Sequence, residues 1–231
     1  MSLLATRGLS RDFGGLKAVH DVDFDLPEGQ IRALIGPNGA GKTTFVGMLV
    51  GRIAATTGTV AFDSQDISAL PAHKRIRLGI AYTFQITSIF ARLTLHENVA
   101  LAVRDPDKTP AVKAALTQVG LNDRANQIAG DLSYGHQRLL EIAMGLAQNP
   151  RLLILDEPTQ GLADSEIADF KALIRMLAAN TTILLIEHNM SVVMETADHI
   201  TVLNFGEILA EGTPAEIRAN ADVQTAYLGR G

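Results

Sequence analysis

The stretch Leu34–Phe45, "LIGPNGAGKTTF", places three glycines and a lysine directly after a short apolar run. It matches the pattern G-x-x-x-x-G-K-[ST] through Gly36, Gly41, Lys42 and Thr43. Glycine lets backbone N–H groups turn inward around an anion, because no Cβ is in the way. A helix that begins near Lys42 adds the positive end of its dipole, and the lysine adds a mobile full charge. The stretch therefore predicts a phosphate-binding loop between a strand and a helix.

The chemistry of this loop suits ATP with its metal ion. Lys42 is expected to reach the β- and γ-phosphates, and the hydroxyl of Thr43 to ligate Mg²⁺. The alternative is an ordinary glycine-rich turn, which the strand before the loop and the helix after it make unfavourable. The residues expected to surround the phosphates are Gly36, Pro37, Asn38, Gly39, Ala40, Gly41, Lys42, Thr43 and Thr44.

Asp156 and Glu157 follow a second apolar run in "LLILDEPT" (residues 152–159). In parallel sheets, ligands bind at the carboxyl ends of the strands. We expect Asp156 to hold Mg²⁺ opposite Thr43, and Glu157, oppositely directed in an extended strand, to polarise an attacking water. Two solvated surface acids are the alternative. A small-molecule kinase would also have a phosphate loop, but nothing in this sequence marks a pocket for an acceptor.

Composition excludes several classes of protein. The chain has 231 residues, 47% of them hydrophobic, so it can bury a full core. It has no cysteine, which rules out disulfides and thiolate metal sites, and its net charge of −5 disfavours a nucleic-acid partner. No apolar run approaches the roughly 18–20 residues of a membrane span, and the N-terminus lacks a signal-peptide core. We therefore expect a soluble, cytoplasmic protein.

The order of patterns predicts a single α/β domain, residues 1–231. Loose alternation over residues 3–26 indicates antiparallel strands with one wet face. The apolar runs around residues 152–156 and 182–186, with a helix over 164–179 between them, indicate a βαβ unit, and residues 199–212 indicate an edge hairpin. A mostly helical block from Thr94 to Gln148 interrupts this pattern. We expect a catalytic lobe formed by residues 1–84 and 149–231, and a helical subdomain at about 85–148.

"LSYGHQR", residues 132–138, precedes an amphipathic helix whose apolar residues recur at intervals of three and four. Ser133 stands in an N-cap position. Taken alone, the stretch is a capped helix start with a nearby glycine.

The complete set of motifs resembles that of ATP-binding-cassette (ABC) ATPases. Their order is the phosphate loop, Gln85 in "AYTFQ", "LSYGHQR", "LLILDEPT", "GLAD" and His188 in "LLIEH". The resemblance extends from about Phe13 to Gly212. It implies a RecA-like P-loop NTPase core with an antiparallel β subdomain and an inserted α-helical subdomain, and it implies ATP hydrolysis with Mg²⁺.

The resemblance also implies roles for single residues. Phe13 corresponds to the aromatic residue that stacks on adenine, although a core strand phenylalanine is the alternative. Gln85 corresponds to the glutamine that touches Mg²⁺ and the attacking water, and His188 to the switch histidine on the γ-phosphate. Asp164 corresponds to the aspartate of the loop that crosses between subunits, and it could also cap a helix. In the signature, Tyr134 and His136 replace a glycine and a glutamine of the commonest form, LSGGQ, while Ser133 and Gly135 remain.

In this family the signature faces the γ-phosphate held by another subunit. ATP then joins two chains, and hydrolysis releases them. The chain has one phosphate loop and one signature, so the resemblance implies a homodimer or a heterodimer with a related ATPase. Transmembrane permease subunits would supply the pore and dock beside Gln85. The docking site would be a groove beside Gln85. Four apolar residues could line this groove, or could instead belong to local core: Ile86, Ile89, Phe90 and Leu93.

Details within the motifs, such as "IEHNM" and "FGGL", resemble the ATPases of branched-chain (hydrophobic) amino-acid importers, with urea and short-amide importers as relatives. This subgroup implies a periplasmic or extracellular solute-binding protein and a position on the inner face of the membrane. Two alternatives remain. One is a soluble cassette ATPase of translation or DNA repair, and the other is a P-loop phosphotransferase.

Overall fold

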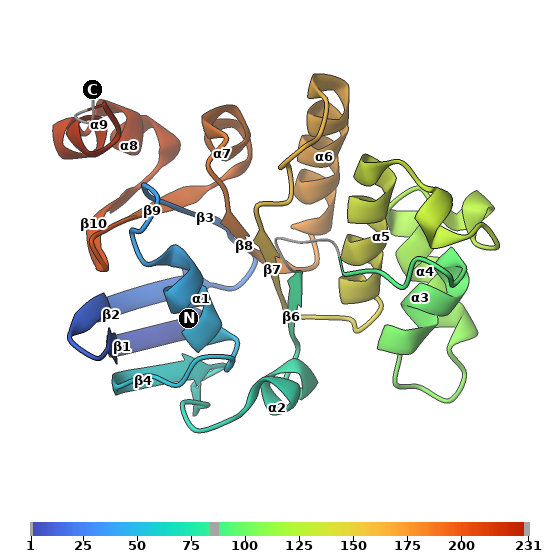
Figure 1. The fold of residues 1–231 in the computed structure, drawn as a ribbon, viewed down its shortest axis with the longest axis horizontal. Helices are drawn as coiled ribbons and strands as arrows, with labels where there is room; N and C mark the ends of the chain where they lie inside the picture. Colours follow the sequence, from blue (N-terminus) through green and yellow to red (C-terminus); the bar gives the residue numbers. More distant parts are fainter. Residues whose placement is uncertain (1, 84–87, 229–231) are drawn as a thin grey trace.

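The computed structural model describes residues 2–83 and 88–228, and within them the strands form two sheets (Figure 1). The first sheet has four strands in the order β2-β1-β4-β5, all paired antiparallel. Its long strands alternate buried and exposed positions, as expected for a sheet with one wet face. The prediction of antiparallel strands near the N-terminus is confirmed. The strands are β1 (Ser2–Phe13), β2 (Leu16–Pro27), β4 (Thr57–Phe62) and β5 (Gln65–Asp66).

The second sheet has six strands in the order β10-β9-β3-β8-β7-β6. All neighbours pair in parallel except β10, which forms an antiparallel hairpin with β9 at the edge. The predicted βαβ unit and edge hairpin are therefore confirmed. The strands are β3 (Ile31–Ile35), β6 (Ile80–Thr83), β7 (Leu152–Asp156), β8 (Thr182–Ile186), β9 (His199–Asn204) and β10 (Glu207–Gly212).

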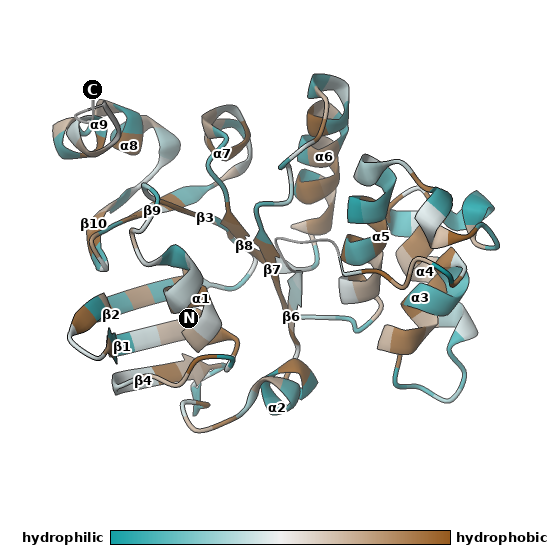
Figure 2. Ribbon diagram, in the orientation of Figure 1, coloured by the Kyte–Doolittle hydropathy of each residue, from teal (hydrophilic) through white to brown (hydrophobic). Residues whose placement is uncertain are grey.

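Every residue of β3, β7 and β8 is buried, because both faces of the parallel sheet are covered. Successive side chains point to opposite faces. Ile154 packs with the antiparallel sheet and α1, whereas Leu153 and Leu155 pack with the helical block. Figure 2 shows β7 and β8 as a mainly hydrophobic centre between these two layers.

The predicted helical block is confirmed by three α-helices between β6 and β7. Their apolar residues pack on one another and on the parallel sheet in one continuous cluster that includes Leu95, Leu116 and Leu140. In the described part of the chain the α-helices are α1 (Lys42–Leu49), α2 (Ala72–Arg77), α3 (Leu95–Ala102), α4 (Thr109–Gln118), α5 (Tyr134–Leu146), α6 (Asp164–Leu177), α7 (Met190–Thr196), α8 (Pro214–Ala219) and α9 (Ala221–Leu228).

Helices α2 and α7 were not expected from the sequence. Helix α2 has only six residues and no apolar stripe, and it is held by the buried guanidinium of Arg75. This group donates hydrogen bonds to the carbonyls of Leu70, Ser68, Met48 and Leu49. Helix α7 begins where the Asn189 side chain accepts two backbone N–H groups. Both helices therefore depend on contacts that periodicity does not reveal.

Within residues 2–83 and 88–228, no helix combines the length and apolar character that a membrane span requires.

Candidate nucleotide-binding site

The phosphate loop connects β3 to α1, as predicted, and close backbone packing shapes it. Gly36 and Gly41 have φ angles of +154° and +99°. A Cβ on Gly36 would lie 2.2 Å from the carbonyl oxygen of Leu203, and one on Gly41 would lie 2.3 Å from that of Ala18. Only glycine fits both the dihedral angle and the space at these two positions. Neighbouring segments therefore hold the loop in its curved form.

Lys42 lies at the start of α1 with its side chain folded onto the loop. Its Nζ donates hydrogen bonds to the carbonyl oxygens of Gly36 at 2.6 Å and Pro37 at 3.1 Å. Burial lowers the pKa of Lys42, and the negative charges of Glu157 and Asp156 act in the opposite direction. The ammonium group thus sits between a ring of backbone dipoles and two carboxylates, where phosphate oxygens could replace its carbonyl partners.

A hollow of about 530 Å³ opens over this loop. Such a volume lies in the range of small-molecule sites, roughly 300–1,000 Å³. Polar and apolar groups share its walls, which suits a ligand with a charged end and a flat organic end. Residues 16–18 and 38–44, Glu157 and Phe205 line it.

Asp156 is the last residue of β7 and is buried. Its Oδ2 accepts a hydrogen bond of 2.7 Å from the hydroxyl of Tyr82, which lies on the neighbouring strand β6. Burial raises the pKa of Asp156, while the Tyr82 hydrogen bond and the charge of Lys42 oppose that rise. A cation bound here would relieve the cost of burying this carboxylate.

Glu157 leaves the strand, contrary to the extended geometry expected from its position. Strand β7 ends at Asp156, and Glu157 has a φ of +48°. Its N–H donates to the carbonyl oxygen of Ile186 on β8 at 2.8 Å, which fixes this turn. A turn therefore directs the side chain, and strand alternation does not. Glu157 Oε2 lies 3.8 Å from Nδ1 of His188, which follows β8 and is exposed.

The signature stretch forms the start of α5, and the predicted N-cap at Ser133 is confirmed. Ser133 Oγ accepts the backbone N–H of His136 at 3.4 Å and lies 2.7 Å from Nδ1 of the same residue. Helix α5 also closely approaches α6: a Cβ on Gly135 would lie 2.3 Å from Oε1 of Glu166. The ring of Tyr134 covers Gly161, in the loop before α6.

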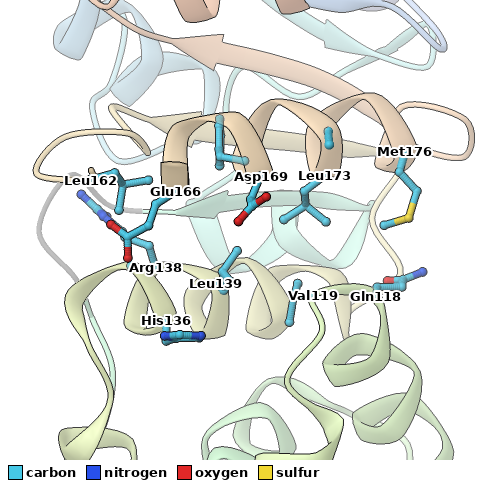
Figure 3. Close-up of a pocket in the computed structure, with 13 residues that line it drawn as sticks. Gln118, Val119, His136, Arg138, Leu139, Leu162, Glu166, Asp169, Leu173 and Met176 are labelled. Atoms are coloured by element: carbon cyan, nitrogen blue, oxygen red, sulfur yellow. The ribbon is translucent and has the colours of Figure 1, made fainter. Parts of the chain in front are cut away.

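The signature and the phosphate loop of one chain lie apart. In Figure 1, α1 and α5 are on opposite sides of strands β7 and β8. Among the described residues that line the hollow over the phosphate loop, none belongs to the signature. The signature instead borders a separate groove of about 430 Å³ between α5 and α6 (Figure 3). A single chain therefore does not bring its two phosphate-related motifs together.

Comparison with known proteins gives the family. The family model described as "ABC transporter" matches residues 19–160, and one described as "Branched-chain amino acid ATP-binding cassette transporter" matches residues 207–231. The chain belongs to the ABC transporter family. Its ABC ATPase fold and its activity, ATP hydrolysis coupled to transport, follow from this membership.

Individual relatives align with this ABC ATPase over nearly its whole length. The high-affinity branched-chain amino acid transport ATP-binding protein BraF of Pseudomonas aeruginosa is 43% identical, and LivG of Escherichia coli K12, of the same description, is 42% identical. Each alignment covers 98% of both proteins. The solved ADP conformation of MJ1267, an ATP-binding cassette of an ABC transporter, is 28% identical with a TM-score of 0.93, covering 100% of both chains.

Asp164 does not cap a helix in this ABC ATPase, so that suggestion was wrong. It is the first residue of α6, and Ala163 occupies the N-cap position. The backbone N–H of Ala163 instead donates to Oε2 of Glu166, which is three positions further on, at 2.9 Å. Asp164 lies one residue past the N-cap, and its exposed side chain makes no cap bond.

Phe13 is not a core residue, which removes the alternative considered for it. It ends β1 beside the turn at Gly14 and Gly15, and its side chain is 45% exposed. The guanidinium of Arg11 lies 4.4 Å from the ring centroid. Phe13 is not among the described residues that line the hollow, whereas the exposed Leu16 and Phe205 are.

Part of the expected docking groove lies outside the described residues. Gln85 and Ile86 belong to that part. Of the remaining apolar residues, Ile89 packs against the core, and Phe90 is 55% exposed. Leu93 is half-buried.

Glu187 is a buried carboxylate whose role was not predicted from the sequence. Its Oε1 accepts hydrogen bonds from the backbone N–H and the hydroxyl of Thr159, and its Oε2 accepts the N–H groups of His188 and Asn189. It thereby joins the turn that holds Glu157 to the turn that holds His188. An acid directly after the apolar run of β8 was the only signal in the sequence.

Proposed function

We propose that this ABC ATPase drives an importer of branched-chain amino acids, as a nucleotide-sandwich dimer beneath separate membrane subunits. The observation that supports the substrate class is the 43% identity to BraF over 98% of the chain. The match of residues 207–231 to a branched-chain amino-acid transporter model supports the same class. Urea and short amides are the related substrates that a transport assay has to separate from it.

The proposal requires partners that this chain does not supply. Transmembrane permease subunits would form the pore and hold the ATPase at the inner face of the membrane. A solute-binding protein outside that membrane would deliver the amino acid. The exposed ring of Phe90, beside the half-buried Leu93, offers apolar surface for the permease contact.

The separation of the two phosphate-related motifs in one chain supports the dimer. Ser133 and the N-terminal N–H groups of α5 form an anion-attracting end far from their own phosphate loop. In a head-to-tail dimer, each signature would lie over the nucleotide of the partner. The signature residues are Ser133, Tyr134, Gly135 and His136. Asp164, the first residue of α6, would directly follow the loop that crosses between them.

The described residues fit Mg²⁺ in their chemistry. Thr43 offers a hydroxyl in the first turn of α1, and Asp156 offers a buried carboxylate with Lys42 nearby. Mg²⁺ prefers such oxygen ligands together with phosphate oxygens and water. We assign Thr43, Asp156 and Gln85 to the metal, which when bound neutralises charge that develops on the phosphates.

The remaining steps use groups of the chain itself. The loop N–H groups and Lys42 bind the β- and γ-phosphates. Glu157 accepts hydrogen bonds from the attacking water and orients it toward the γ-phosphate. His188, 3.8 Å from Glu157, contacts the γ-phosphate and keeps the carboxylate in place. Release of phosphate then removes the charge that held the two chains together.

The test is co-expression with permease subunits of a branched-chain amino-acid importer, followed by reconstitution into vesicles. We expect ATP-dependent uptake of leucine, isoleucine and valine that is lost in Lys42→Ala. Release of free phosphate without labelling of a small acceptor separates this motor from a phosphotransferase. Uptake of urea with no uptake of leucine would overturn the assigned substrate class.

A further inference from the structure

The contact between Tyr82 and Asp156 joins two neighbouring strands at the edge of the proposed metal site. Tyr82 pairs with Ile154 in the parallel register of β6 and β7. Asp156 is two residues beyond Ile154, and residues at this spacing lie on the same face of a strand. The register therefore brings the Tyr82 hydroxyl to Oδ2 of Asp156 at 2.7 Å.

Tyr82 is held firmly enough to orient its partner. Its ring packs against the core between the two sheets, and the guanidinium of Arg52 lies 5.8 Å from the ring centroid. Burial, together with the hydrogen bond to Asp156, raises the pKa of the Tyr82 hydroxyl. The hydroxyl keeps its proton at neutral pH and donates to the carboxylate.

This contact determines which oxygen of Asp156 is available to a ligand. A carboxylate has two oxygens, and a donor on one of them fixes the rotation of the whole group. With Oδ2 engaged by Tyr82 and no hydrogen bond from a described residue to Oδ1, we assign Oδ1 to the metal. Carboxylates that bind metals are commonly oriented by such outer partners, and losing the partner typically costs about 10–100-fold in metal affinity.

We propose that Tyr82 is a positioning residue that orients Asp156 for Mg²⁺ binding in the nucleotide complex. The inference rests on the proposed assignment of Asp156 to the metal. A purely structural bond would instead serve only to satisfy a buried carboxylate, and its loss would destabilise the fold without altering metal dependence selectively.

The variant Tyr82→Phe deletes the hydroxyl and keeps the ring. Thr201→Val is the matched control, because it removes a hydroxyl that donates to the carboxylate of Glu211 at 2.6 Å on strands β9 and β10. Both variants are first compared by thermal unfolding. Binding of a fluorescent ADP analogue is then measured without metal and over a range of Mg²⁺ concentrations. Electron paramagnetic resonance of Mn²⁺ with ADP measures the metal directly.

For Tyr82→Phe we expect two quantities to rise about 10-fold or more. One is the Mg²⁺ concentration that gives half of the maximal increase in ADP affinity, and the other is the dissociation constant of Mn²⁺. Metal-free ADP binding should change less than about twofold, and Thr201→Val should match the parent in both. In an Asp156→Asn background, Tyr82→Phe should add nothing further, since the two act as one unit.

Two results would overturn the positioning role. One is that ADP binding by Tyr82→Phe depends on Mg²⁺ as in the parent, and the other is that ADP affinity falls equally with and without metal. Failure of the proposed site itself gives a different result: the parent protein would then bind ADP equally with and without Mg²⁺, or Asp156→Asn would leave the metal dependence intact.

Discussion

Ser133 Oγ and His136 Nδ1 lie 2.7 Å apart in the first turn of α5, so one hydrogen is shared between a hydroxyl and an imidazole. Serine has a single hydroxyl hydrogen. If Ser133 donates it to His136, it cannot donate it to a phosphate. If His136 carries hydrogen on Nδ1, the imidazole donates to Ser133 and the serine hydrogen is available to an anion from the partner chain.

This pair predicts that His136 restrains the Ser133 hydroxyl during assembly. In the tautomer that accepts on Nδ1, the imidazole takes the serine hydrogen that an anion of the partner chain would otherwise receive. Replacing the imidazole with a side chain that cannot accept should therefore strengthen ATP-driven dimerisation. The charged groups that line the same groove are Arg138 on α5 and Glu166 and Asp169 on α6.

Light scattering of Glu157→Gln with ATP, with and without His136→Ala, measures the effect. We expect His136→Ala to lower the dimer dissociation constant several-fold, and to have no such effect in a Ser133→Ala background. Equal dissociation constants with and without His136→Ala would show that the pair does not control assembly.

Glu157→Gln should trap the ATP-bound dimer. The amide keeps the size of the side chain but cannot accept a proton from water, so hydrolysis should slow by about 10²–10⁴-fold while ATP still binds. Phosphate release and gel filtration at saturating ATP check the two parts. Adding Ser133→Arg should spare nucleotide binding and abolish the dimer. A Glu157→Gln protein that stays monomeric with ATP and Mg²⁺ would contradict the sandwich.

Phe13 is expected to contact adenine, although Phe205 is the phenylalanine that lines the hollow over the phosphate loop. Base stacking on an aromatic side chain is worth about 1–3 kcal/mol. Phe13→Ala should therefore weaken ATP binding about 5–150-fold and leave pyrophosphate binding unchanged, as calorimetry can measure. Phe205→Ala is the informative comparison. A loss confined to Phe205→Ala would place the base against the β9–β10 hairpin.

Arg75 should support the helix that follows the phosphate loop. Its buried guanidinium donates to the carbonyls of Met48 and Leu49 at the end of α1, at 2.7 and 2.8 Å. Arg75→Lys cannot reproduce this fork, and each buried carbonyl that loses its donor costs about 1–3 kcal/mol. The Met48 carbonyl keeps the N–H of Gly51, at 3.3 Å, but that of Leu49 loses the guanidinium. We expect the free energy of unfolding in urea to fall by about 2–4 kcal/mol. Arg77→Lys, on the exposed side of α2, should change it by less than about 0.5 kcal/mol.

Local chain properties were sufficient for much of this protein. The phosphate loop needs glycines whose conformation and lack of a Cβ are visible in the sequence, and the Ser133 cap depends on bonds within one turn. Continuous apolar runs in the sequence predict the buried strands β7 and β8. The order of these motifs identified the family, which the comparisons confirmed.

Contacts between distant segments decided the rest. The φ of Glu157 is fixed with a hydrogen bond to Ile186 on another strand, and strand alternation alone suggested a different geometry. The hydrogen bonds from Thr159 to Glu187 and from Tyr82 to Asp156 depend on strand order and register. The distance between phosphate loop and signature likewise follows from where the sheet places their helices. Pairing across a sheet joins residues far apart in the chain, so its outcome is set by packing of the whole molecule and cannot be read from any one stretch.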